Sequence, residues 1–215
     1  MGQRKMDRIV VVGGGGHAKV LISVLKKISS YELIGYTDVR DSGELLGIPY
    51  LGPDAVLEKI REPLTDCCAA LGVGKVTVAE NRMRLVNRLV EMGFRLPAVV
   101  SPHAVVNENV TIGEGAVVFD GAVINTGAWI GRASIINTNS TVEHDCRIGG
   151  NVHIAPGANL SGGVRIGANC VIGTGVNVVQ YVSICDGCLI GAGAVVPRDI
   201  IEPGTYVGNP ASKIK

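Results

Sequence analysis

Residues 110–142 read VTIGEGAVVFDGAVINTGAWIGRASIINTNSTV, and an aliphatic residue returns at every sixth position. The complete series has fifteen members and no insertion: Ile112, Val118, Ile124, Ile130, Ile136, Val142, Ile148, Ile154, Leu160, Ile166, Ile172, Val178, Ile184, Ile190 and Val196. An α-helix, with about 3.6 residues per turn, does not generate this period, and strand alternation does not restrict it to every sixth place. Hexapeptide repeats of this kind predict a parallel β-helix.

A small or narrow residue stands two places before each aliphatic one, for example Ala116, Ala122 and Cys146. Three hexapeptides close one triangular coil, so the fifteen repeats predict five stacked coils about 4.8 Å apart. The aliphatic residue points inward and the small residue fits the corner, which agrees with an aromatic content of 4%. Flat-faced solenoids of this kind usually associate side by side, and we expect a homotrimer.

Composition limits the classes of function. The chain has 215 residues and its composition changes near residue 100, so we expect two domains, residues 1–100 and 101–215. A formal net charge of +1 gives no reason to expect nucleic acid or an anionic membrane surface as a partner. The apolar run Ile9–Val12 is too short for a signal peptide, and no stretch could span a bilayer. We therefore expect a cytoplasmic protein.

The six cysteines favour buried, reduced thiols over disulfides. Cys146, Cys170 and Cys188 occupy the small inward place of the repeat. Cys185 and Cys188 have the spacing of a redox or zinc half-site, but no second pair completes four ligands. We expect no metal.

The first hundred residues predict a small Rossmann-like domain. A strand over Ile9–Val12 leads into the glycines Gly13–Gly16, then His17 and a helical pattern. Strand, glycine turn and helix together form the context of a phosphate-binding loop, in which backbone N–H groups and the helix dipole face the anion. A glycine turn without a ligand is the alternative interpretation, and His17 could simply cap or pack against the turn.

Two further strands complete this expectation. The strand over residues 32–36 ends in Thr37 and Asp38, the place where a fold of this type contacts a ribose hydroxyl. The strand Cys67–Leu71 ends in Gly72, and a helix is predicted over residues 76–92. About ninety residues are few for a complete dinucleotide fold, so one bound nucleotide is the more economical interpretation.

A polar turn around His144 is the candidate catalytic site. His144 follows the inward Val142 by two places, and the neighbouring Asp145 could set its tautomer and raise its basicity. Gly162 comes eighteen residues later, directly above His144 on the next coil, with a backbone N–H available to an oxyanion. This pair favours acyl transfer, and a solvated turn histidine is the alternative. His153 lies one and a half faces further and could reach the same cleft only across a subunit interface.

The chain resembles bacterial sugar acetyltransferases with a left-handed β-helix, a group that includes sialic-acid O-acetyltransferases and nucleotide-linked 4-amino-sugar N-acetyltransferases. The resemblance covers nearly the whole chain. It is carried by GGGGHAKV (13–20), TDVR (37–40), ALGVG (70–74), NTNSTVEHDCRIGGNVHIAPGANLSGGVRIG (137–167) and VGNPA (207–211). It implies a fold of the class α/β plus β-solenoid, left-handed winding of the helix, and acetyl-CoA as cosubstrate.

The resemblance also implies roles for single residues. His144 would be the general base, Asp145 would strengthen it where some relatives have glutamate, and the Gly162 amide would stabilise the oxyanion. Transfer would be direct, in a ternary complex. The remaining implied contacts are Asn137 near the sugar, His153 at the acetyl end of coenzyme A, Thr174 and Ala192 along the rest of the cofactor between two subunits, and Gly15, Gly16, His17, Thr37, Asp38 and Gly72 around the sugar nucleotide.

The phosphate loop favours a nucleotide-activated acceptor, because a free sugar would not need one. The resemblance then implies N-acetylation of the 4-amino group of a nucleotide-linked amino-dideoxy sugar. Sugar O-acetylation and a non-catalytic sugar-nucleotide-binding assembly protein are the alternatives. A γ-class carbonic anhydrase would need three converging histidines, which the repeat lacks, and an oxidoreductase would need a second domain for the hydride acceptor.

Overall fold

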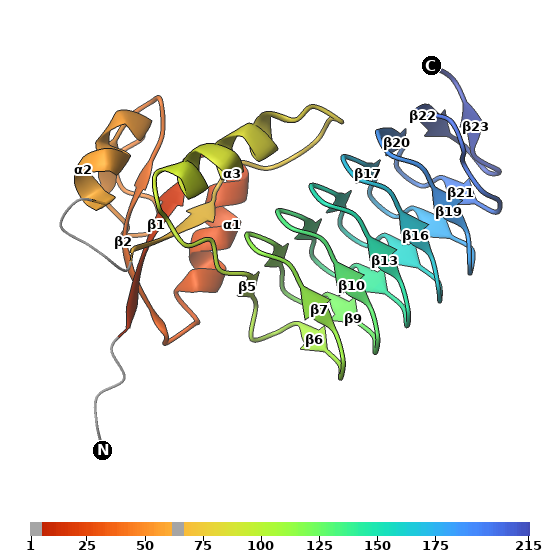
Figure 1. Ribbon diagram of the computed structural model, residues 1–215, viewed down its shortest axis with the longest axis horizontal. Helices are drawn as coiled ribbons and strands as arrows, with labels where there is room; N and C mark the ends of the chain where they lie inside the picture. Colours follow the sequence, from red (N-terminus) through yellow and green to blue (C-terminus); the bar gives the residue numbers. More distant parts are fainter. Residues whose placement is uncertain (1–5, 62–66) are drawn as a thin grey trace.

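The computed structural model describes residues 6–61 and 67–215, which form an α/β domain followed by a long parallel β-helix (Figure 1). The two lie end to end, with the C-terminus at the far end of the β-helix. Both parts of the predicted fold class are confirmed. Within the described residues, no helix has the length and apolar character needed to cross a membrane.

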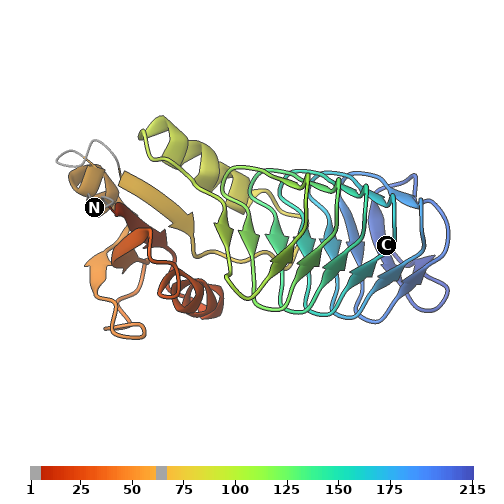
Figure 2. The same ribbon diagram turned by 90° about the horizontal axis from the view of Figure 1, so that it is seen from below.

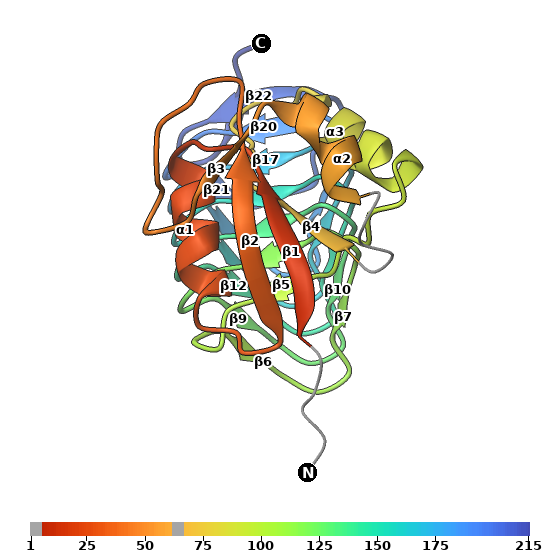
Figure 3. The same ribbon diagram turned by 90° about the vertical axis from the view of Figure 1, so that its left-hand side faces the viewer.

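The N-terminal domain contains a four-stranded parallel sheet in the order β3-β2-β1-β4. Its strands are β1 (Asp7–Val12), β2 (Tyr31–Thr37), β3 (Tyr50–Gly52) and β4 (Cys67–Leu71). Figure 3 shows α1 (Gly16–Leu25) on one face of the sheet, and α2 (Leu57–Arg61) with α3 (Asn81–Glu91) on the other; the short 3-10 helix η1 (Asp54–Val56) precedes α2. Because both faces are covered, β1 and β4 are continuous apolar runs, and the sequence predicted their positions within two residues.

The β-helix has three faces, whose strands stack along the prism as Figure 2 shows. The first face contains β5 (Val99–Val100), β8 (Val117–Val118), β11 (Ile135–Ile136), β14 (His153–Ile154), β17 (Val171–Ile172), β20 (Cys188–Ile190), β22 (Gly204–Val207) and the antiparallel β23 (Ser212–Lys213). The second contains β6 (Val105–Val106), β9 (Val123–Ile124), β12 (Thr141–Val142), β15 (Asn159–Leu160), β18 (Asn177–Val178) and β21 (Val195–Val196). The third contains β7 (Thr111–Ile112), β10 (Trp129–Ile130), β13 (Arg147–Ile148), β16 (Arg165–Ile166) and β19 (Ser183–Ile184).

The predicted inward series forms the core of this prism. From Val118 to Val196 its members are at most 3% exposed, and Cys146, Cys170 and Cys188 are fully buried. Partner strands are offset by one coil, so that Ile136 pairs with Ile154. Stacked aliphatic side chains of similar size explain why the repeat tolerates so little variation.

Truncating one inward residue tests this account of the core. We expect Ile154→Ala to lower the free energy of unfolding by about 2–5 kcal/mol, because Ile154 is fully buried and a rigid prism leaves a cavity. The control, Ile201→Ala, removes a side chain that is 83% exposed and is expected to change it by less than about 0.5 kcal/mol. Urea unfolding at one protein concentration measures both; equal effects would contradict this packing.

A second six-residue period lies in the turns and was not part of the sequence prediction. Every sixth residue from Asn109 to Gly193 has a positive φ, and most of these are glycine, asparagine or aspartate. These residue types adopt the left-handed region most readily. Asp145, with φ 60°, occupies one of these places, so it serves the turn as well as its histidine neighbour. Tyr181, with φ 62°, is an exception.

Two predicted boundaries differ from the structure. The helix expected over residues 76–92 begins only at Asn81, because Val76, Thr77 and Val78 are β-branched and the segment before α3 packs along the β-helix. The β-helix itself begins with β5, just before residue 101, since Val99 and Val100 pair with β8.

One hydrophobic cluster spans the two domains. Val99, Val117 and Ile135 point outward from the first face, yet they are buried in one cluster with Ile9 and Leu21 of the N-terminal domain. The N-terminal domain is therefore docked on the early coils of the first face, and this contact determines where its glycine loop lies.

Candidate active site

His144 lies at the corner between the second and third faces, directly after β12. Its Nδ1 is 2.9 Å from Oδ2 of Asp145. An imidazole that donates from Nδ1 to a carboxylate keeps the lone pair on Nε2, the form that a general base requires. The His144 side chain is 50% exposed, so Nε2 is accessible to a substrate.

Gly162 lies beside this nitrogen on the next coil. A Cβ on Gly162 would come within 2.4 Å of His144 Nε2, and the Gly163 N–H donates to the His144 carbonyl over 2.8 Å. In the part of the chain that the structure describes, the Gly162 N–H has no acceptor. The structure thus brings together His144, Asp145 and Gly162 as the eighteen-residue spacing predicted, while their catalytic roles stay predictions.

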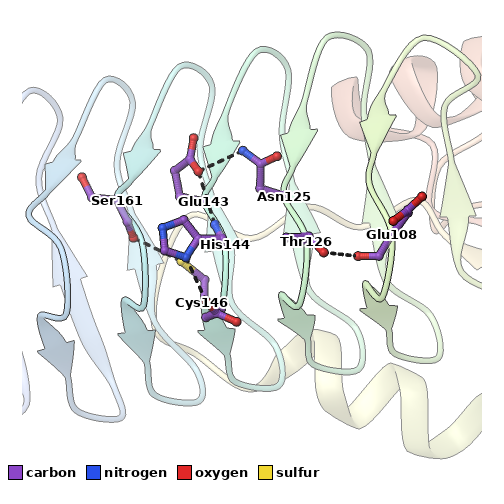
Figure 4. A network of polar contacts seen from close by, with 8 residues as sticks. Glu108, Asn125, Thr126, Glu143, His144, Cys146 and Ser161 are labelled. Carbon is purple, nitrogen blue, oxygen red and sulfur yellow. Dashed lines mark hydrogen bonds and ion pairs between the residues drawn. The ribbon is translucent and has the colours of Figure 1, made fainter.

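A ladder of polar side chains supports the turn that carries His144 (Figure 4). Asn107 donates to Asn125 over 2.6 Å, and Asn125 donates to Oε2 of Glu143 over 2.9 Å. The same Oε2 accepts from the His144 N–H at 3.3 Å. Below the ring, the Cys146 thiol donates to the Ser161 carbonyl over 3.3 Å. The backbone on both sides of the imidazole is therefore held in place.

The glycine loop of the N-terminal domain forms a pocket of about 290 Å³. The residues that line it are Gly13, Gly14, Gly15, Gly16, His17, Asp38, Gly72, Val73 and Gly74. The Gly14 N–H donates to Oδ2 of Asp38 over 2.6 Å, which joins the loop to the end of β2. Of the six residues predicted around a nucleotide, five line the pocket. Thr37 does not, because it is fully buried and donates to Asp54 over 2.9 Å.

His17 is held in the neutral form at the edge of this pocket. Burial, followed by the charge of Arg82 and by His153, lowers the pKa of His17 to about 3, although a hydrogen bond to the Leu71 backbone opposes the shift. Its ring packs edge-on against Phe119 at a centroid distance of 5.3 Å. His17 could therefore contact a phosphate or a base only as a neutral hydrogen-bonding group.

Asn137 and His153 contact each other rather than His144. His153 Nδ1 lies against the Lys75 carbonyl, to which only an N–H can donate, so Nε2 accepts from Asn137 Nδ2 at 2.9 Å. His153 is 9% exposed, and this burial lowers its pKa. Both ring nitrogens are therefore occupied, Nδ1 by the N-terminal domain and Nε2 by Asn137 of the β-helix. The predicted contact of His153 with the acetyl end of coenzyme A stays a prediction.

Thr174 and Ala192 lie in consecutive turns of another corner, between the first and second faces. The Gly193 N–H donates to the Thr174 carbonyl over 2.8 Å. This corner and the corner of His144 are separated by the second face of the prism. One protomer therefore does not bring the predicted catalytic residues and the predicted cofactor contacts into one cleft.

Comparisons with known proteins agree with both domains. Residues 8–89 match the PglD N-terminal domain, and residues 145–180 match the bacterial transferase hexapeptide family. The acetyltransferase domain of PglB from Neisseria gonorrhoeae FA1090 is 36% identical, with a TM-score of 0.90 over 96% of this chain and 99% of that one. The chain belongs to this family of sugar acetyltransferases.

Two other relatives extend the comparison. Perosamine N-acetyltransferase from Caulobacter crescentus, solved as a mutant with CoA and GDP-perosamine, is 35% identical with a TM-score of 0.89 over 96% of each chain. UDP-N-acetylbacillosamine N-acetyltransferase of Bacillus subtilis (strain 168) is 33% identical over 114 residues, about half the length of either protein. As a member of this family, the protein is an acetyl-CoA-dependent acyltransferase, and its β-helix is left-handed.

In the part of the chain that the structure describes, none of the cysteines of the acetyltransferase forms a disulfide. Cys185 Sγ and Cys188 Sγ lie 3.6 Å apart, and Cys170 contacts both residues through its thiol. In residues 6–61 and 67–215, no group of three or more histidine, cysteine or carboxylate side chains is placed to hold a metal ion.

Several residues around the two sites were not found from the sequence. Glu143 stands next to His144, so its adjacency was an available signal. Val73 and Gly74 also line the pocket, together with Gly13 and Gly14 of the glycine loop that the sequence predicted. Arg82 had no such signal, since a single arginine in an amphipathic helix is normally solvated.

Proposed function

We propose that this acetyltransferase transfers the acetyl group of acetyl-CoA to the 4-amino group of a nucleotide-linked amino-dideoxy sugar. The observation that carries the proposal is the position of His144 Nε2 beside Gly162, whose N–H has no acceptor among the described residues, with Nδ1 on Asp145. The glycine pocket provides a binding place for a nucleoside diphosphate. The relative solved with CoA and GDP-perosamine supports the same substrate class.

The proposed chemistry follows from the two nitrogens. His144 Nε2 takes a proton from the sugar amine as the amine nitrogen attacks the thioester carbonyl. The carbonyl oxygen becomes an oxyanion and accepts a hydrogen bond from the Gly162 N–H. When the tetrahedral intermediate collapses, the C–S bond breaks and the coenzyme A sulfur takes the proton from His144. The products are an amide and free coenzyme A.

The site is completed, in this proposal, between subunits of a homotrimer. The His144 corner of one protomer would face the Thr174 and Ala192 corner of its neighbour, with acetyl-CoA between them. This arrangement explains why the side chain of His144, the proposed general base, is half exposed in a single protomer. Sedimentation equilibrium should give three times the chain mass of 22.4 kDa, and a monomer active at high dilution would contradict it.

A substitution that disturbs the pocket tests whether the nucleotide binds there. A Cβ at Gly72 would lie 2.6 Å from the Gly13 carbonyl oxygen and 2.9 Å from that of Val12, and neither backbone atom can move away easily. We expect Gly72→Ala to raise the Kd for a nucleoside diphosphate by more than about tenfold, since the loop must shift. Isothermal calorimetry with UDP, GDP and dTDP measures this, with coenzyme A as the internal control. An unchanged nucleotide affinity would place the nucleotide elsewhere.

A coenzyme A release assay against a panel of nucleotide-linked 4-amino sugars tests the reaction itself. Mass spectrometry should show one added acetyl group on the sugar nucleotide. Resistance of the product to hydroxylamine identifies an amide, whereas release of acetyl hydroxamate identifies an O-ester and overturns the N-acetylation. Absence of coenzyme A release with the whole panel, while nucleotides still bind, would favour a non-catalytic binding protein.

A further inference from the structure

Arg82 is a buried cation at the contact between α3 and the β-helix. Its side chain is 2% exposed, and burial lowers the pKa of the guanidinium to about 9, so it remains charged at neutral pH. Among the described residues no carboxylate pairs with Arg82. A buried charge without a counter-ion is unfavourable, so this arginine requires a reason beyond packing.

The hydrogen-bond partners of Arg82 are three backbone carbonyls. Nε donates to Ala133 in the β-helix over 3.0 Å. Nη1 donates to Leu71, at the end of β4, over 3.2 Å, and also to Val73. Val73 lines the glycine pocket, whereas Arg82 does not. The guanidinium therefore stands behind the pocket wall and joins that wall to the β-helix.

This contact determines which way the wall presents its peptide groups. The Val73 carbonyl and the Gly74 N–H belong to one trans peptide unit, in which the two groups point in opposite directions. Because Arg82 holds the Val73 carbonyl on its own side of the wall, we expect the Gly74 N–H to point to the opposite side, toward the pocket that Gly74 lines. A backbone donor facing a pocket of glycines suits an anion.

The position of the charges around the pocket also favours an anion, because Arg82 is a nearby cation. Its lining contains the carboxylate of Asp38 and neither lysine nor arginine. Arg82 Nη2 is buried and has no hydrogen-bond partner among the described residues. Arg82 also acts electrostatically on His17, which lines the pocket. A diphosphate in the pocket would therefore meet a positive charge supplied through the wall.

We propose that Arg82 is the positioning residue of the nucleotide pocket: it fixes the peptide units from Leu71 to Gly74, and its charge favours a diphosphate on their far side. The inference rests on the proposed function, because it requires that a nucleoside diphosphate binds there. Arg82 contacts no substrate itself and acts through the backbone of Val73 and Gly74.

The test compares Arg82→Lys with Arg84→Lys, a matched change of an exposed arginine on the same helix. Lysine keeps the charge but lacks the planar fork that reaches several carbonyls at once. We expect Arg82→Lys to raise the Kd for UDP, GDP or dTDP, whichever binds the wild type, by about tenfold. The Kd for coenzyme A should stay within about twofold for both variants, because the wall is not part of its groove.

Three results would overturn the inference. Equal nucleotide affinity in Arg82→Lys and the wild type leaves the proposed function intact and removes the role of Arg82. Equal weakening of nucleotide and coenzyme A binding shows a general structural role. A wild type that binds none of the three nucleoside diphosphates removes both the inference and the proposed substrate class.

If circular dichroism shows that Arg82→Lys does not fold, a second measurement, made on the wild type, tests the inference instead. In the wild type, the buried Arg82 Nε–H should give a solvent-protected signal in ¹⁵N-arginine NMR spectra. Addition of the bound nucleoside diphosphate is expected to shift this signal, and addition of coenzyme A is not. A signal that does not respond to the nucleotide would overturn the inference without any substitution.

Discussion

Replacing His144 by alanine is expected to lower kcat by about two to four orders of magnitude, the contribution of a positioned general base. The reason is the arrangement of the ring: Asp145 holds Nδ1 at 2.9 Å, and Nε2, which has no partner in residues 6–61 and 67–215, lies beside Gly162. The variant should bind nucleoside diphosphate and coenzyme A with wild-type affinity, because the pocket and the Thr174 corner are unchanged. Steady-state kinetics by coenzyme A release, together with calorimetry, measures both effects.

His103→Ala is the matched control for this variant. His103 is an exposed histidine near the start of the β-helix, outside the residues that form either site. It should retain wild-type kcat. An unchanged kcat in His144→Ala would mean that the amine arrives already deprotonated or that another base acts, and the assignment of His144 would be lost.

The second large effect is expected from Gly162→Ala, which adds a single methyl group. That methyl would lie 2.4 Å from His144 Nε2, so the ring must leave its place beside the amide. Gly162 does not have a positive φ, and the His144 side chain is half exposed and can turn outward. We therefore expect kcat to fall by about 10²-fold, the cost of misplacing a catalytic group, with little change in Tm.

Gly150→Ala serves as the control for the added methyl. Gly150 also has no positive φ, and the nearest atoms to its Cβ would be at an ordinary contact distance of 3.6 Å. This variant should keep full activity and stability. Full activity in Gly162→Ala would show that the ring and the amide do not act on the same reacting group. A large fall in Tm would instead show that the substitution disturbs the coil itself.

Most of the β-helix could be predicted from the sequence because its rule is local. Each hexapeptide places one aliphatic residue inside, and the eighteen-residue coil then puts Gly162 above His144 whatever the rest of the chain does. The strands Asp7–Val12 and Cys67–Leu71 were equally accessible, since a parallel strand covered on both faces is a continuous apolar run.

The start of α3 could not be predicted from the local sequence. A helix was predicted from residue 76, but residues 76–80 are not helical, and both ends of this stretch contact the β-helix: the Lys75 carbonyl accepts a hydrogen bond from His153, and Glu80 accepts one from Asn169. The local sequence pattern does not reveal a contact between two residues that are 78 positions apart. The pairing of Asn137 with His153 was missed for a related reason, since its geometry depends on that docked segment.

By itself, the sequence determined the prism, the alternation of its inward residues, the glycine loop after β1 and the stacking of His144 under Gly162. Only the tertiary structure decided how the N-terminal domain is seated on the first face, and with it the environments of His17, His153 and Arg82. Arg82 and Ala133 are 51 positions apart and belong to different domains. Repeat periods determine neighbours within a coil, whereas the docking of two domains depends on the shape and burial of whole surfaces.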